Sequence, residues 1–148
     1  MTSPEWIDGA AKLTRIFGYW PSFHDAEVLW VRLDRGPVHE EGGCGPALEA
    51  LFHAFEMTNE VGPDGVYVQR HHVLVRLRFH DISGLNLEGF NHQNVLFEMS
   101  ISDLRELEME KIDFEVTLTT SYGLRGCFQC HRVEVIEVTP CTEKAVPL

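Results

Sequence analysis

The first apolar pattern along the chain has the spacing of an amphipathic helix. Apolar residues recur at intervals of four, three and four positions, at Trp6, Ala10, Leu13 and Phe17. Such intervals place side chains on one face of a helix. Ser3 can cap a helix whose first residue is Pro4, and Gly18 is a natural stop. We therefore predict one helix over residues 3–18, whose apolar stripe packs on a sheet.

Beyond residue 26 the dominant pattern changes to an alternation of apolar and polar residues, which is the period of a half-buried strand. The segments with this pattern are residues 27–34, 72–80, 94–102, 114–119 and 127–138. In the third segment the predicted core face consists of Val95, Phe97, Met99 and Ile101. In the last segment the alternation changes phase by one residue after Val135, which predicts a β-bulge.

Residues 47–58 fit two structures. Their apolar side chains have helical spacing, at Leu48, Leu51, Phe52 and Phe55, although the segment also suits a strand buried on both faces. The turn signal Pro63-Asp64-Gly65 then leads into another extended segment, as in a β-hairpin, so we favour a strand. The charge-rich residues 103–113 suit a helical turn or a hairpin tip. Residues 121–126 predict a turn, and the glycines and prolines within 36–46 predict a mobile loop.

Together these elements predict one α+β domain, mainly an antiparallel β-sheet with a single N-terminal amphipathic helix. The strands lie within residues 27–138, and residues 139–148 form a short tail that we expect to fray after Pro140. A chain of 148 residues with 44% hydrophobic residues is large and apolar enough to build a core without disulfides or metals.

The charge balance favours a protein partner. Asp and Glu number 23 against 12 Lys and Arg, so the formal net charge is -11. Such a chain has too few cations to neutralise several phosphates at once, which argues against nucleic acid and anionic membranes as partners. A basic protein is favoured instead, although acidity also serves solubility alone.

The N-terminal residues contain charges throughout and no continuous apolar stretch of the kind found in a secretory signal. No apolar run approaches the roughly 18 residues of a membrane span. We therefore predict a soluble, cytoplasmic protein. In that compartment the four cysteines, Cys44, Cys127, Cys130 and Cys141, are expected to be reduced thiols.

One cysteine pair matches a cofactor motif literally. Residues 127–131 spell C-x-x-C-H, the attachment pattern of c-type haem. These residues open a predicted strand, however, and residues three apart on a strand point to opposite faces. The sulfurs of Cys127 and Cys130 should therefore diverge, which disfavours both haem and zinc, and we predict no cofactor and no metal.

The adjacent pair His24 and Asp25, followed by Glu27, can in principle hold a metal or act as acid and base. The structural alternative, which we favour, is that Asp25 accepts hydrogen bonds from nearby backbone amides while His24 donates to a neighbouring carbonyl. A small metal-dependent enzyme would need these residues together with another histidine, such as His92.

Three blocks of sequence resemble the immunity protein 50 family of bacterial polymorphic toxin systems. They are residues 19–28 (YWPSFHDAEV), 55–58 (FEMT) and 87–94 (LEGFNHQN). The resemblance implies a protein that binds and blocks a cognate toxin in the cytoplasm and has no catalytic residues. We interpret the motif residues as structural: Trp20, Pro21, Phe23, His24, Asp25, Glu27, Phe90, Asn91, His92 and Asn94.

We therefore predict a toxin-neutralising immunity protein that is not an enzyme and whose partner is a basic toxin domain. The acidic residues expected to contact this partner form two sets in loops: Glu40 and Glu41, and Glu106, Glu108 and Glu110. We expect only one of the two sets to matter. The alternatives are the metal-dependent enzyme and a regulatory or structural subunit of a larger assembly.

Overall fold

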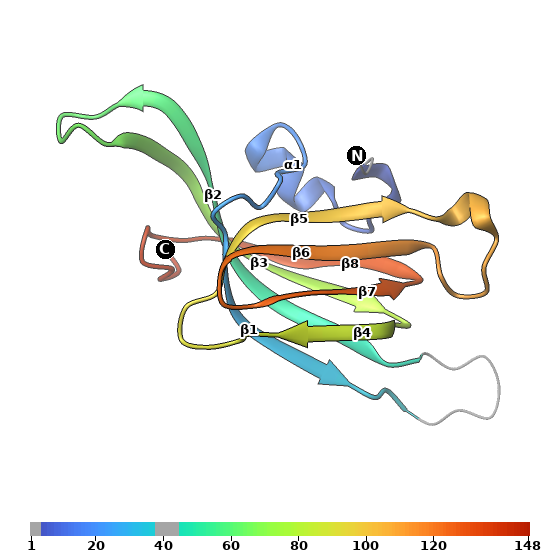
Figure 1. The fold of residues 1–148 in the computed structure, drawn as a ribbon. Helices are drawn as coiled ribbons and strands as arrows, with labels where there is room; N and C mark the ends of the chain where they lie inside the picture. Colours follow the sequence, from blue (N-terminus) through green and yellow to red (C-terminus); the bar gives the residue numbers. More distant parts are fainter. Residues whose placement is uncertain (1–3, 38–44) are drawn as a thin grey trace.

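The computed structural model describes residues 4–37 and 45–148. It confirms a single domain that is mostly antiparallel sheet with one short α-helix near its N-terminus (Figure 1). Its strands are β1 (Glu27–Asp34), β2 (Ala47–Val61), β3 (Tyr67–His80), β4 (Ser83–Glu88), β5 (Val95–Asp103), β6 (Phe114–Tyr122), β7 (Arg125–Cys130) and β8 (Arg132–Pro140). They form one sheet in the order β4-β7-β6-β5-β1-β2-β3-β8.

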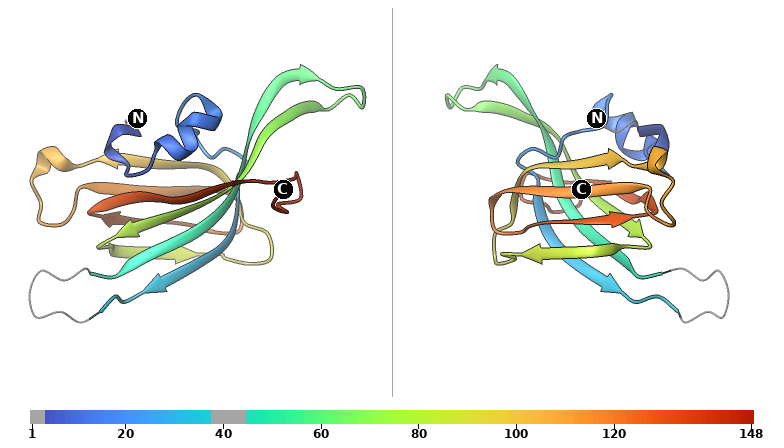
Figure 2. Two further views of the ribbon diagram at one scale, coloured as in Figure 1. Left: turned by 180° about the vertical axis from the view of Figure 1, so that it is seen from behind. Right: turned by 45° about the vertical axis from the view of Figure 1, so that its right-hand side comes forward.

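The sheet folds over at its middle, so that its two halves enclose the core (Figure 2). The joint is narrow, because β1 and β5 share only the pair Glu27 and Val95. Aromatic side chains meet across the core, where the rings of Phe79 on β3 and Phe128 on β7 have centroids 5.1 Å apart. Both rings are fully buried. Because most of the strands have one face in this core, the alternation seen in the sequence follows directly.

The predicted helix over residues 3–18 is wrong in its length. The structure has a 3-10 turn, Pro4–Trp6, and a separate helix α1, Ala11–Phe17. Between them Asp8 lies along β8, with its N–H donating to Val133 and its carbonyl accepting from Val135. Gly9 then approaches β8 so closely, at φ 73°, that a Cβ there would lie 2.7 Å from the carbonyl oxygen of Val135. The predicted apolar stripe is nevertheless correct, since its residues pack on the core.

The segment that fitted two structures is a strand, because residues 47–58 lie within β2. Both faces of its first half are covered. Phe52 faces the core, while Glu49 on the outer face is only 6% exposed beneath Arg32 and Arg78. The predicted turn follows, since the Gly62 N–H donates to Val66 and closes a hairpin between β2 and β3. Beyond the body of the sheet, this hairpin projects as an arm (Figure 1).

Two strand predictions need correction. Residues 127–138 form not one strand but the end of β7 and most of β8, which lie in different halves of the sheet. The bulge predicted after Val135 is confirmed, because Arg76 pairs with Glu137 whereas Leu77 pairs with Val135. The predicted turn over 121–126 is also shorter than expected, since β6 ends at Tyr122 and β7 begins at Arg125. Residues 103–113 combine both alternatives, as a hairpin tip that contains the 3-10 turn Arg105–Leu107.

The C-terminal tail is ordered, contrary to the expected fraying. The Cys141 N–H donates to the His72 carbonyl at 3.0 Å, and the Leu148 N–H donates to the Pro140 carbonyl at 3.1 Å. The residues between them turn back so that Cys141 and Pro147 form a β-bridge. Most of the predicted loop over 36–46 lies outside the described residues. Within the part of the chain that is described, no helix is long and apolar enough to cross a membrane.

Candidate functional site

The segment over residues 22–26 is fixed against β5 by backbone hydrogen bonds. The Asp25 N–H donates to Leu96 at 2.9 Å, the Leu96 N–H donates to Ala26 at 2.9 Å, and the Met99 N–H donates to Ser22 at 3.0 Å. Two residues of this segment, Phe23 and Asp25, have positive φ angles of 64° and 65°. Non-glycine residues adopt this conformation only when the surrounding structure holds them there.

Opposite this segment, β5 bulges at Phe97. Its neighbours Leu96 and Glu98 pair with Thr120 and Thr119, which leaves Phe97 as the extra residue. The predicted core face is therefore wrong at this position, because Leu96 takes the buried place and the Phe97 side chain is 52% exposed. Bulges redirect side chains in this way, and here the result is an aromatic ring at the surface.

His24 packs directly on this exposed ring. The two rings meet edge to face with centroids 5.3 Å apart. The His24 Nδ1 lies 2.7 Å from the Phe97 carbonyl oxygen, which can only accept, so the ring nitrogen donates. The predicted bond from His24 to a neighbouring carbonyl is thus confirmed, and it fixes the backbone of the bulge as well as the ring.

A shallow pocket of about 200 Å³ continues from His24 towards the base of the arm. Buried Phe23 lines it together with Phe55, and Tyr19 and Met57, which are 50% and 43% exposed, also contribute to its lining. The Tyr19 hydroxyl donates to Glu56 at 2.7 Å. We call the exposed side chains of this region the motif surface, defined as Tyr19, His24, Met57 and Phe97. Exposed aromatic and methionine side chains gathered around a pocket are typical of protein-binding surfaces.

The predicted role of Asp25 as an acceptor for backbone amides is wrong. Its carboxylate lies 3.5 Å from His24 Nε2, and its own N–H, donating to Leu96, ties it to the neighbouring backbone. The carboxylate is 39% exposed, so it adds a negative charge beside the aromatic surface. Aspartate also tolerates the positive φ of this position better than most residues.

The residues of the alternative metal-dependent enzyme do not gather into one site. Glu27 is on β1, where it pairs with His53 and Val95, and His92 is an exposed residue of the loop between β4 and β5. Among the described residues, no group of three or more His, Cys, Asp and Glu side chains could hold a metal ion.

The family block over residues 87–94 is organised by one buried side chain, that of Asn94. Its Oδ1 accepts from the N–H groups of Asn91 and Leu124, at 3.0 and 3.1 Å, and its Nδ2 donates to the Asn91 carbonyl at 2.8 Å. Asn94 is 3% exposed. These hydrogen bonds support the interpretation of Asn94 and Asn91 as structural residues. Phe90, in the same loop, is by contrast 53% exposed.

The predicted partner-binding residues Glu106, Glu108 and Glu110 all lie at the tip of the β5–β6 hairpin and are exposed. Leu107 and Met109 alternate with them and are 63% and 39% exposed. The base of the tip is fixed, because Arg105 pairs with Asp103 at 2.9 Å and lies over the Trp6 ring at 4.3 Å. The other predicted residues, Glu40 and Glu41, lie outside the described part of the chain.

The predicted divergence of Cys127 and Cys130 is confirmed. Cys130 is fully buried on the core face of β7 beside Phe128, whereas Cys127 pairs with Thr117 on the outer face. Burial, together with nearby Asp113, raises the pKa of the Cys130 thiol to about 12. Buried thiols of this kind are unreactive.

Two histidines meet where the arm leaves the sheet. His53 Nε2 and His72 Nδ1 are 2.9 Å apart, so one ring donates to the other, and Phe55 lies beside the His72 ring. Burial lowers the pKa of both imidazoles, and the neighbouring His72 lowers that of His53 further. The nearby Glu143 carboxylate partly offsets the lowering of the His72 pKa, and Glu27 is the backbone partner of His53 in the β1–β2 pairing.

The lowered pKa values of His53 and His72 predict that the protein loses stability in mild acid. The folded protein binds these protons less readily than the unfolded chain, whose histidines titrate near about pH 6.5. The stabilisation is thus fully present above that pH and is lost as the pH falls below it. We expect the melting temperature to fall between about pH 7.5 and about pH 5.5, and the fall to be smaller in the double variant His53→Gln/His72→Gln.

The measurement is the difference between the melting temperatures of one variant at the two pH values. The variant His92→Gln, which removes an exposed histidine, should behave like the unmodified protein. An equal pH dependence in the double variant would show that the pair is not its source.

The chain matches one known protein family over most of its length. Residues 9–141 match the model of the family described as immunity protein 50, and this range contains all eight strands and the whole motif surface. No match was found among curated proteins or among solved structures. Because the family match covers most of the chain, the protein belongs to the immunity protein 50 family.

Proposed function

We propose that this immunity protein neutralises a bacterial toxin domain by binding it and blocking its active site or the path of its substrate. The partner is a basic domain of a polymorphic toxin, and the encounter takes place in the cytoplasm. The protein inhibits the toxin by occupying this site or path, so it needs no catalytic residue or cofactor. The partner to test is the toxin domain encoded beside this gene, since immunity genes usually neighbour the toxin gene.

The main support for a binding role is the exposed Phe97 ring, which lies in the motif surface together with other apolar side chains. Exposed apolar side chains that gather in this way mark interaction sites more often than isolated ones do. Here the protein fixes the ring in place with His24 and with the strained backbone of residues 22–26. A preorganised aromatic side chain loses little conformational entropy on binding, which is why such residues contribute strongly to interfaces.

The acidic hairpin tip supports a second contribution, to the rate of encounter. Its three glutamates form no ion pair with the residues that the structure describes. Unpaired carboxylates on a projecting tip attract a basic partner over distances near the Debye length of about 10 Å at moderate salt. We propose that the tip, rather than Glu40 and Glu41, supplies this attraction.

We expect the association rate with the toxin domain to fall as the ionic strength rises, while the dissociation rate changes much less. The triple variant Glu106→Lys/Glu108→Lys/Glu110→Lys should associate about tenfold more slowly at low salt and should lose most of the salt dependence. Folding should survive, because all three side chains are exposed. Stopped-flow or surface measurements at low and moderate salt give both rates.

The control is the variant Glu40→Lys/Glu41→Lys, which reverses two acidic charges outside the hairpin tip. If both variants slow association to the same extent per charge, the overall charge and not the tip steers the partner. If salt leaves the rate of the unmodified protein unchanged, the acidity serves solubility alone.

A further inference from the structure

The arm formed by β2 and β3 has no neighbouring strand along most of its length, within the part of the chain that is described. The β1–β2 pairing ends at Glu27 and His53, and the β3–β8 pairing ends at Val73 and Pro140. Beyond these points the two strands pair only with each other. Two-stranded ribbons are at best marginally stable in water, and their open edges can pair with an added strand.

The arm also exposes apolar side chains. These are Met57, Val61, Val66, Tyr67 and Val68, each at least 37% exposed. Its base, in contrast, is fixed to the body of the protein. Glu56 on β2 accepts hydrogen bonds from Tyr19 and from Arg70 on β3, and the His53–His72 contact also ties the two strands together there. An arm that is held at its base and exposes apolar residues beyond it is preorganised for a partner.

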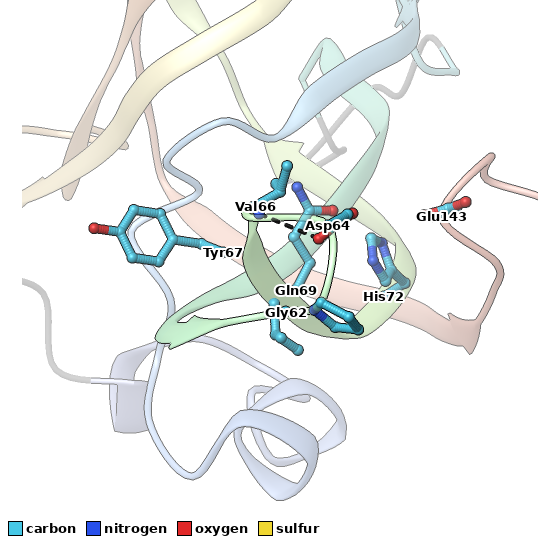
Figure 3. A pocket seen from close by; sticks show the side chains of 9 residues that line it. Gly62, Asp64, Val66, Tyr67, Gln69, His72 and Glu143 are labelled. Atoms are coloured by element: carbon cyan, nitrogen blue, oxygen red, sulfur yellow. Dashed lines mark hydrogen bonds between the residues drawn. The ribbon is translucent and has the colours of Figure 1, made fainter.

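A groove runs along the arm beside the C-terminal turn. It has a volume of about 660 Å³ and is lined by the hairpin turn from Gly62 to Val66, by Tyr67, Val68, Gln69 and His72 on β3, and by Glu143. Figure 3 shows Glu143 on the C-terminal segment beside the part of β3 that carries His72, and Tyr67 pointing away from these side chains. The groove is open to solvent, so an extended chain could enter it.

The charges in this groove favour a cationic occupant. Asp64 and Glu143 line it from two different segments, and neither has an ion pair within the described part of the chain. Arg70, which is on the same stretch of β3, is already paired with Glu56. His72, the one basic group in the lining, has its pKa lowered by burial.

We propose that this groove is a second docking site, which takes an extended segment of the toxin domain bearing a Lys or Arg side chain. The cation lies between Asp64 and Glu143, and Val66 and Val68, which also line the groove, cover the rest of the segment. This proposal rests on the proposed function, because it names the toxin as the occupant. It adds a contact beyond the motif surface.

The test compares two double variants that remove the same number of charges. Asp64→Asn/Glu143→Gln neutralises the groove while keeping the shape of both side chains, and the amide oxygen that replaces the Asp64 carboxylate can still accept the hydrogen bond from the Val66 N–H. Glu60→Gln/Glu137→Gln neutralises one exposed carboxylate on the arm and one on β8, both outside the groove lining. Each is titrated with the toxin domain encoded beside this gene.

We expect the groove variant to bind the toxin domain about tenfold more weakly, mainly through faster dissociation, as is usual for close contacts. The control variant should bind within about twofold of the unmodified protein. Equal affinities for the two variants would overturn the groove proposal while leaving the proposed function intact. Failure of the unmodified protein to bind the toxin domain would instead overturn the proposed function, and the groove proposal with it.

Discussion

Replacing Asn94 by alanine is expected to lower the free energy of unfolding by about 3 kcal/mol, since leaving a buried polar group without its partner costs about 1–3 kcal/mol and several groups are affected. The Asn94 side chain bonds to backbone groups of Asn91 and Leu124 and reaches the Val28 carbonyl at 3.5 Å. It therefore joins the β4–β5 loop, the β6–β7 turn and β1. Chemical denaturation of the purified variant measures the loss.

The matched control is Asn91→Ala in the same loop. The Asn91 side chain is exposed and bonds to Gly89 and Gln93, two residues away on either side, so its loss should cost less than about 1 kcal/mol. Equal losses for the two variants would contradict the view that Asn94 organises this region. The slope of the denaturation curve should be unchanged in both variants, because neither alters the surface exposed on unfolding by much.

Most of the fold could be predicted because most of the strands have one face in the core. Alternation identifies β1, β3 and β6 directly, and the turn at Pro63 favours a strand for β2. The break in the predicted helix could not be found in the same way. It depends on the pairing of Asp8 with β8, a contact between distant parts of the sequence that local spacing does not encode.

The candidate site could be predicted only in part. The resemblance identified His24 and its neighbours, and the expected hydrogen bond from His24 to a carbonyl is present. The sequence did not reveal that Phe97 leaves the core, because one added residue in a strand changes the phase without changing the composition. The presence of apolar Leu96 directly before Phe97 was the available signal, since either residue could take the buried position.

The contribution of Tyr19 and Met57 was also missed, for a different reason. Both residues lie within the blocks 19–28 and 55–58 that carry the resemblance. Neither was singled out, because only the fold brings Met57 on β2 to the same pocket as Tyr19 and His24. The exposure of the acidic residues was easier to predict, because glutamates in a hairpin tip stay in water on account of their charge.

Replacing Phe97 by alanine is expected to weaken toxin binding at least about 30-fold, the loss that corresponds to about 2 kcal/mol at a central interface residue. The ring is exposed in the free protein and lies outside the core, so the melting temperature should change little. The control is Phe90→Ala, which removes the same side chain at a position of nearly equal exposure, 53% against 52%, and should change the affinity by less than about threefold.

The most direct test of the proposed interface is the dissociation constant of the toxin domain for the unmodified protein, for Phe97→Ala and for Phe90→Ala, measured by titration calorimetry at one salt concentration. We predict tight binding by the unmodified protein and by Phe90→Ala, and markedly weaker binding by Phe97→Ala. Equal affinities for all three proteins, or no binding by the unmodified protein, would contradict the assignment of the motif surface as the toxin-binding site.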